Sequence, residues 1–233
     1  MSTVILACRT IADELNRAIK VTRVDYPVFW VESGLHNYPD NLRRRIQDEI
    51  DRIGNVSCII LVFGYCGNSL LGLKSNEARL VFPRVDDCIS LLLGSFQTRQ
   101  TLSREMTSYF LTRGWIDYES SLWKEYDHCV KRYGPEKTWK IMKIMLNHYK
   151  RLVLIDTGAY DLDGYLEKTG AFAQTFGLKH QVVPGSLRLL EKLLRGPWDE
   201  EFVIIEPGEE IGLEHLLLEG GDEEESQVLF RFR

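Results

Sequence analysis

Three cysteines each follow a short apolar run that has the length of a buried strand. The cysteines are Cys8, Cys66 and Cys88, and the runs that precede them are Val4–Ala7, Ile59–Phe63 and Leu80–Phe82. A deprotonated cysteine is a strong metal ligand and a nucleophile. If the three runs are strands of one parallel sheet, all three thiols leave the sheet at its carboxyl edge, where open α/β sheets keep their ligand sites. The pattern therefore predicts that three sulfur atoms converge.

An imidazole is predicted at the same edge. His36 lies in the segment Gly34-Leu35-His36-Asn37, just beyond a further extended run. Three thiolates and one imidazole make up the tetrahedral sulfur and nitrogen set that zinc prefers. We therefore expect a zinc site of Cys8, Cys66 and Cys88, with His36 as the fourth ligand or as a contact to substrate.

Other interpretations of the same thiols stay open. The cysteines are scattered over about 80 residues without a CxxC pair, and free cysteine is among the most buried residue types, so packing alone explains them as well. The three thiols also suit an iron–sulfur cluster with one open iron. His36 has the alternative of a histidine bonded to backbone. Cys58 and Cys129 are expected to be packing residues.

Four polar residues are predicted to contact a small-molecule substrate. Tyr65 and Asn68 flank the Cys66 turn, Arg84 follows a strand, and Asp156 ends the run Leu154-Ile155-Asp156. Asp156 is equally well explained as a helix cap. The sequence contains no P-loop and no GxGxxG fingerprint, which leaves little support for a bound nucleotide.

Alternating strands and helices must position these residues. Seven runs of strand length are expected at residues 4–7, 26–31, 58–63, 79–82, 151–155, 180–183 and 202–205, with helices at 11–20, 41–53, 87–93, 162–176 and 186–194. Repeated βα alternation predicts an α/β fold with a mostly parallel, Rossmann-like sheet.

The chain divides into four predicted segments. An N-terminal βα half with the cysteine motifs spans residues 1–95, and a mainly helical insert rich in aromatic residues spans 96–150. A C-terminal βαβαβ half spans 151–210, and a terminal arm with a last strand near 228–232 spans 211–233. We expect a cleft between the two halves, partly covered by the insert.

Composition narrows the partners and the compartment. A formal net charge of -5 over 233 residues provides no basic field for nucleic acid. No apolar run approaches the roughly 20 residues of a membrane span, and the first residues do not form a signal peptide. Five cysteines are too few for a disulfide scaffold. These features predict a cytoplasmic protein with no nucleic-acid or membrane partner.

Several segments together resemble a known family. They are Gly34-Leu35-His36-Asn37, Phe63-Gly64-Tyr65-Cys66-Gly67-Asn68, Pro83-Arg84-Val85-Asp86-Asp87-Cys88, Thr112-Arg113-Gly114-Trp115 and Leu154-Ile155-Asp156-Thr157-Gly158. In their order and in their residues, these segments resemble the bacterial and archaeal family catalogued as domain of unknown function 1638. The resemblance extends from Cys8 to about Gly208. One departure is Asp86, where the family pattern has histidine.

The resemblance implies a functional set and a setting. It singles out Cys8, Cys66, Cys88 and His36. Members of the family often accompany corrinoid proteins and methyltransferases of one-carbon metabolism, so the resemblance implies a catalytic or accessory part in methyl transfer. The alternatives are a cluster-dependent enzyme and a binding module that uses its cysteines only for packing.

Overall fold

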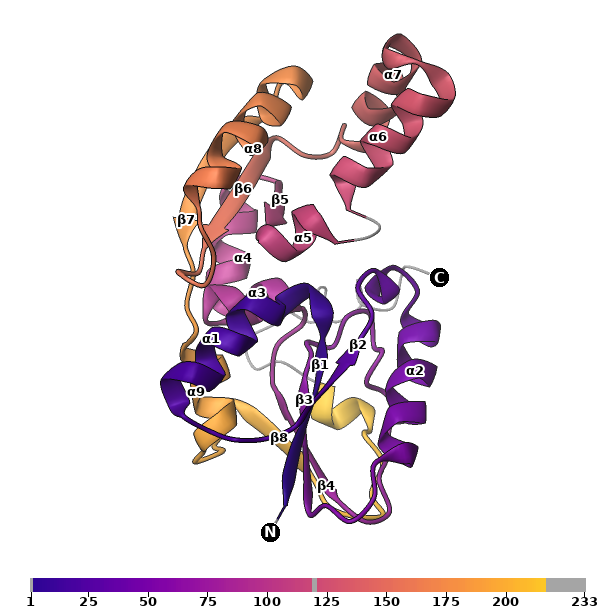
Figure 1. Ribbon diagram of the computed structural model, residues 1–233, viewed down its shortest axis with the longest axis vertical. Coiled ribbons are helices and arrows are strands. Elements are labelled where there is room, and N and C mark those ends of the chain that lie inside the picture. Colours follow the sequence, from indigo (N-terminus) through magenta and orange to yellow (C-terminus); the bar gives the residue numbers. More distant parts are fainter. Residues whose placement is uncertain (1, 119–120, 217–233) are drawn as a thin grey trace.

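The computed structural model describes residues 2–118 and 121–216 and contains two mostly parallel sheets (Figure 1). The first sheet has the order β2-β1-β3-β4-β8. Its strands are β1 (Thr3–Cys8), β2 (Val28–Val31), β3 (Cys58–Val62), β4 (Arg79–Pro83) and β8 (Phe202–Ile205). The pairs β1–β2, β1–β3 and β3–β4 are parallel, and β8 runs antiparallel to β4.

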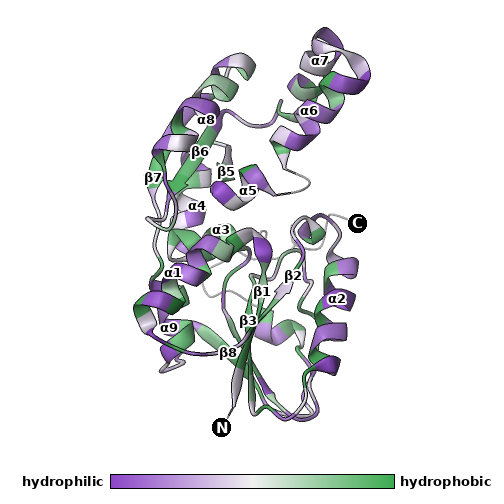
Figure 2. Ribbon diagram, in the orientation of Figure 1, coloured by the Kyte–Doolittle hydropathy of each residue, from purple (hydrophilic) through white to green (hydrophobic). Residues whose placement is uncertain are grey.

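The central strands β1, β3 and β4 of the first sheet are almost entirely apolar because both of their faces are covered. In β1, Val4 and Leu6 enter one core, whereas Ile5 and Ala7 enter the other. The first core is covered by α2 (Pro39–Arg52), and the second by α1 (Ala12–Thr22) and α9 (Arg188–Arg195). Figure 2 shows the apolar strands between helices whose outer faces are hydrophilic. A strand buried on both faces is a continuous apolar run, which is why these strands were predictable.

The second sheet, β5-β6-β7, is parallel throughout. Its strands are β5 (Ser108–Leu111), β6 (Arg151–Asp156) and β7 (Lys179–Pro184). One face packs on α5 (Arg113–Asp117), α6 (Leu122–Tyr133), α7 (Pro135–Met145) and α8 (Asp163–Phe176), and the other on α3 (Cys88–Leu93) and α4 (Phe96–Glu105). The short helices η1 (Arg9–Ile11), η2 (Leu35–Asn37) and η3 (Leu213–Leu216) complete the elements. Helix α3 links the two sheets, because Leu91 and Leu92 pack in the core of the first sheet and Ile89 and Leu93 pack against the second.

The structure confirms the α/β class with mostly parallel sheets and differs from the sequence analysis in three respects. The strands form two sheets rather than one. The stretch 96–150, expected to be mainly helical, contains β5, whose four residues are too few to show a period. The run 202–205, expected in the C-terminal half, instead closes the edge of the first sheet as β8.

The strand expected near 228–232 lies outside the described residues. Within 2–118 and 121–216, none of the helices combines the length and the apolar character that a membrane span requires.

Candidate functional site

A cavity of about 250 Å³ opens at the carboxyl edge of the first sheet. All four predicted ligands line it, together with eight further residues. The four are Cys8, Cys66, Cys88 and His36, and the others are Thr10, Glu32, Leu42, Phe63, Gly67, Asp87, Ile89 and Trp115. The structure therefore brings the predicted set to one place, which we call the cysteine pocket.

Each of the four residues enters the cysteine pocket at the end of a different strand. Cys8 is the last residue of β1, and Cys88 is the first residue of α3, shortly after β4. Cys66 lies in the loop after β3, and His36 lies in η2 after β2. Because these strands are neighbours in a parallel sheet, their carboxyl ends share one edge, and the side chains that follow them meet there.

The loop after β3 is bonded directly to the loop after β4. The backbone N–H of Cys66 donates to the Asp86 carbonyl at 2.8 Å. Cys66 itself has a φ of 42°, which is unusual for a residue other than glycine. A Cβ at Gly64 would lie 2.7 Å from the Asp87 carbonyl oxygen, so only glycine permits this approach. The two loops thereby hold Cys66 beside Cys88.

The buried thiols are neutral in the absence of a cation. The pKa of Cys88 is raised well above its ordinary value by a hydrogen bond with Cys66 and by burial. Burial, reinforced by Cys88, raises the pKa of Cys8 to about 12, and its thiol donates to Thr10 Oγ1 at 3.3 Å. Thiols in this state are poor nucleophiles, and a bound cation would have to displace their protons.

His36 is available as a neutral base. It is exposed as a residue, yet the protein surrounds its imidazole enough that desolvation lowers its pKa, with Asp87 opposing the shift. A neutral imidazole keeps the nitrogen lone pair that a metal or a substrate proton requires. As the side chains stand, no group of three or more His, Cys, Asp or Glu residues in the described chain is arranged to hold a metal ion. The thiols share the cavity without a finished coordination geometry.

All four predicted substrate contacts lie outside the lining of the cysteine pocket. Tyr65 is buried, and its hydroxyl donates to the His215 carbonyl at 3.4 Å. The Asn68 carbonyl accepts from Arg43 at 3.0 Å. Asp156 ends β6 in the second sheet and accepts the Gly158 N–H at 3.0 Å within the turn that follows. The helix-cap alternative is wrong, because the next helix, α8, begins only at Asp163 and has Leu162 at its N-cap.

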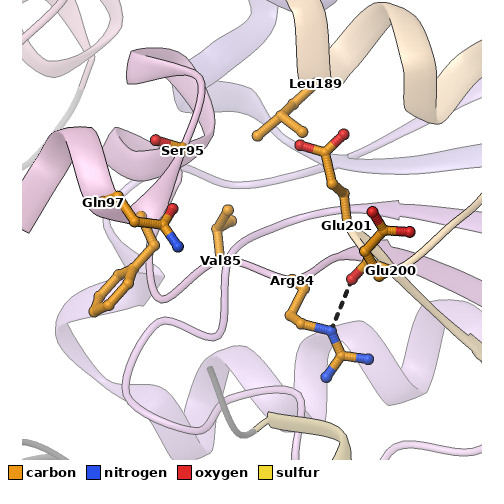
Figure 3. Close-up of a pocket in the computed structure, with 8 residues that line it drawn as sticks. Arg84, Val85, Ser95, Gln97, Leu189, Glu200 and Glu201 are labelled. Carbon is orange, nitrogen blue, oxygen red and sulfur yellow. Dashed lines mark hydrogen bonds between the residues drawn. The ribbon is translucent and has the colours of Figure 1, made fainter. Parts of the chain in front are cut away.

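Arg84, the fourth predicted contact, lines a separate pocket of about 200 Å³ (Figure 3). Its Nε donates to the Glu200 carbonyl at 3.1 Å, and its Nη1 donates to the His215 carbonyl at 3.3 Å. Both acceptors belong to the chain segments that follow α9. Arg84 therefore attaches the C-terminal segments to the first sheet.

The remaining cysteines and Asp86 lie outside the lining of the cysteine pocket. Cys58 opens β3 at the opposite end of the sheet from the pocket, and Cys129 on α6 donates to Glu125 at 3.5 Å. Neither lines the cysteine pocket. Asp86 accepts a hydrogen bond from the Ser90 hydroxyl. It stabilises the start of α3 rather than lining the cavity.

Glu32 and Trp115 are two of the eight lining residues that were not predicted from the sequence. Glu32 directly follows β2, so the strand-end argument that selected His36 applies to it as well. Trp115 comes from α5 and packs against the cores of both sheets. Its helix approaches so closely that a Cβ on Gly114 would overlap the Thr10 carbonyl oxygen. No local pattern could have indicated that α5 closes the pocket.

A buried carboxyl group lies where α1 meets the second sheet. Glu14 is fully buried, and its Oε1 accepts from Thr157 Oγ1, which follows β6, at 3.1 Å. Its Oε2 is buried without a hydrogen-bond partner among the described residues. Burial raises the pKa of Glu14 to about 7. The protonated form of Glu14 is therefore the one that the folded protein favours.

Stability is expected to fall as the pH rises from about 5 to 8. Because the pKa of Glu14 is about 7 in the folded protein and 4.5 as its ordinary value, the folded state retains a proton that the unfolded state releases. The free energy of unfolding loses up to about 3 kcal/mol from this group as the pH rises through the folded pKa. Urea denaturation across this pH range should show that the free energy of unfolding falls less steeply with pH in Glu14→Gln than in the unchanged protein. The exposed Glu167→Gln serves as control, and equal slopes in all three proteins would contradict the assignment.

Comparison with known proteins gives one match. The family described as "Protein of unknown function (DUF1638)" matches residues 30–194, well over half of the chain. This range includes His36, Cys66 and Cys88 and begins after Cys8. No curated protein and no solved structure matches the chain.

Proposed function

Since the chain belongs to DUF1638, a family of proteins of unknown function, we propose a function from its pocket. We propose that Cys8, Cys66 and Cys88 bind one zinc ion and that the cysteine pocket holds a thiol or methyl-bearing substrate beside it. His36 is the fourth ligand or the substrate contact.

The convergence of three thiols from neighbouring parallel strands supports this proposal most directly. The thiols share a cavity whose other walls include the apolar side chains of Leu42 and Phe63. The two buried, protonated thiols of Cys8 and Cys88 give a divalent cation protons to displace and anionic sulfur to bind. Zinc prefers sulfur and nitrogen ligands, and an imidazole that stays neutral at pH 7 completes the set.

The proposed chemistry is methyl transfer. Bound zinc supplies Lewis-acid activation of a thiol or of a methyl-bearing group. The chain supplies the walls: Phe63 and Trp115 line the cavity with apolar surface, and the Thr10 hydroxyl, 3.3 Å from the Cys8 sulfur, would donate a hydrogen bond to the thiolate once the proton is displaced. We propose a corrinoid protein or methyltransferase of one-carbon metabolism as the partner, on the basis of the family resemblance.

Metal analysis of protein purified without oxygen tests the proposal. We expect a colourless protein with one zinc per chain. A brown protein with stoichiometric iron and sulfide would replace zinc by an iron–sulfur cluster on the same three thiols. A protein that stays metal-free after incubation with either metal would overturn the metal site and favour a non-catalytic binding module.

A further inference from the structure

The lining of the cysteine pocket is acidic and contains no lysine or arginine among the residues that the structure describes. Glu32 and Asp87 both line it. A backbone hydrogen bond and the guanidinium of Arg45 lower the pKa of Glu32, so its carboxylate is ionised at neutral pH. Asp87 caps α3 by accepting the Ser90 N–H at 2.8 Å. An anionic ligand would therefore meet carboxylates and no cationic side chain.

Cations outside the lining offset these carboxylates only in part. Arg45 lies 3.1 Å from Glu32 but is also paired with Glu49. The charge of Arg9 also lowers the pKa of Glu32, and this effect is smaller than that of Arg45. Arg99 approaches Asp87 no closer than 3.9 Å. A zinc ion bound by three thiolates would add a net charge of about -1 to the same space, because three anionic ligands exceed the charge of a divalent cation. The electrostatic preference of the pocket is therefore for a positive ligand.

The remaining wall is apolar and aromatic. Leu42, Phe63 and Ile89 line the cavity from the first sheet and its helices, and Trp115 lines it from α5. Trp115 is only partly buried, so part of its ring is free to contact a ligand. Aromatic faces attract cations whose charge is spread over alkyl groups, and such cations need no hydrogen-bond donors or acceptors.

We propose that the cysteine pocket binds a small alkylated cation, such as a quaternary ammonium or sulfonium group, packed against Trp115 and balanced by Glu32 and Asp87. The cavity of about 250 Å³ limits the ligand to a compact head group. The proposal rests on the proposed function for the substrate role of this pocket and for the charge of the metal centre. The acidic and aromatic lining belongs to the chain itself.

Three isosteric probes test the charge preference by calorimetry. They are choline, the neutral alcohol in which a tert-butyl group replaces trimethylammonium, and the carboxylate of the same carbon skeleton. We expect choline to bind about tenfold more tightly than the neutral alcohol, and the carboxylate not to bind. Equal affinity for choline and the alcohol, or no binding of choline at all, would overturn the proposal.

Measurements on zinc-loaded and metal-free protein separate this proposal from the metal site. Choline preference in a protein that binds no zinc would overturn the proposed function and retain the cation pocket. Stoichiometric zinc without a preference for choline over the neutral alcohol would retain the proposed metal site and overturn the cation pocket.

Two variants connect the preference to named side chains. Trp115→Leu should lower choline affinity about tenfold and leave affinity for the neutral alcohol nearly unchanged. Trp139→Leu, on α7 and outside the pocket, is the matched control. Because Trp115 packs against both cores and its loss could disturb folding, the exposed Glu32→Gln provides the second test. It should weaken choline binding several-fold and leave zinc content unchanged, and unaltered choline binding in both variants would contradict the assignment.

Discussion

Replacing Cys66 or Cys88 with alanine is expected to abolish zinc binding, whereas replacing Cys58 with alanine should leave zinc content unchanged. Removal of a ligand's hydrogen-bond partner lowers metal affinity roughly 10- to 100-fold. Removal of a thiolate ligand itself should lower metal affinity by more than this. Cys58 is buried but opens β3 at the end of the sheet remote from the pocket. Its replacement should cost only packing, about 1 kcal/mol of unfolding free energy. Metal analysis of dialysed protein and chemical denaturation measure the two effects.

The controls separate ligands from buried apolar residues. Cys129→Ala, on α6, should behave as Cys58→Ala does. Zinc content that stays unchanged in the single alanine variants of Cys8, Cys66 and Cys88 would end the metal hypothesis. His36→Ala distinguishes its two roles, because loss of a ligand lowers zinc affinity, while loss of a substrate contact leaves zinc bound and weakens ligand binding.

Replacing Gly114 with alanine is expected to destabilise the protein severely. The new Cβ would overlap the Thr10 carbonyl oxygen and lie 2.8 Å from its carbonyl carbon, and both are backbone atoms that no side-chain rotation can move away. Helix α5 must therefore shift away from η1, and Trp115 shifts with it. We expect a loss of at least about 3 kcal/mol of unfolding free energy, measured by urea denaturation, and a loss of ligand binding to the cysteine pocket.

Gly54→Ala is the matched control. Nothing lies within 4 Å of a Cβ added at Gly54, so its unfolding free energy should change by no more than about 1 kcal/mol. If Gly114→Ala proves as stable as Gly54→Ala, the close approach of α5 to η1 is incorrect. The wall that Trp115 provides would then be lost as well.

Part of the site was predictable because it depends on local pattern and a general rule. Continuous apolar runs such as 58–62 indicate strands that are buried on both faces. Their alternation with helices implies parallel pairing, which places the residues that follow each strand at one edge. That reasoning selected Cys8, Cys66, Cys88 and His36 without knowledge of any contact, and all four line one cavity.

Other parts depended on contacts between segments far apart in the chain. Tyr65 and Arg84 follow their strands as the cysteines do, yet both donate to the carbonyl of His215, which no local pattern places beside them. The tertiary structure alone decided that β8 joins the first sheet and that α5 brings Trp115 to the cysteine pocket.

The sequence by itself therefore determined the α/β class, the buried strands and the sheet edge at which the thiols emerge. Short stretches of residues are enough for this, because continuous apolar runs indicate strands buried on two faces and their alternation with helices indicates parallel pairing. The tertiary structure decided the division into two sheets, the acidic and aromatic wall and the seating of α5 on η1. These features arise from packing between segments that are far apart in the sequence. The free energy of such packing depends on the shapes of both segments, and neither segment shows a hydrophobic periodicity that would reveal it.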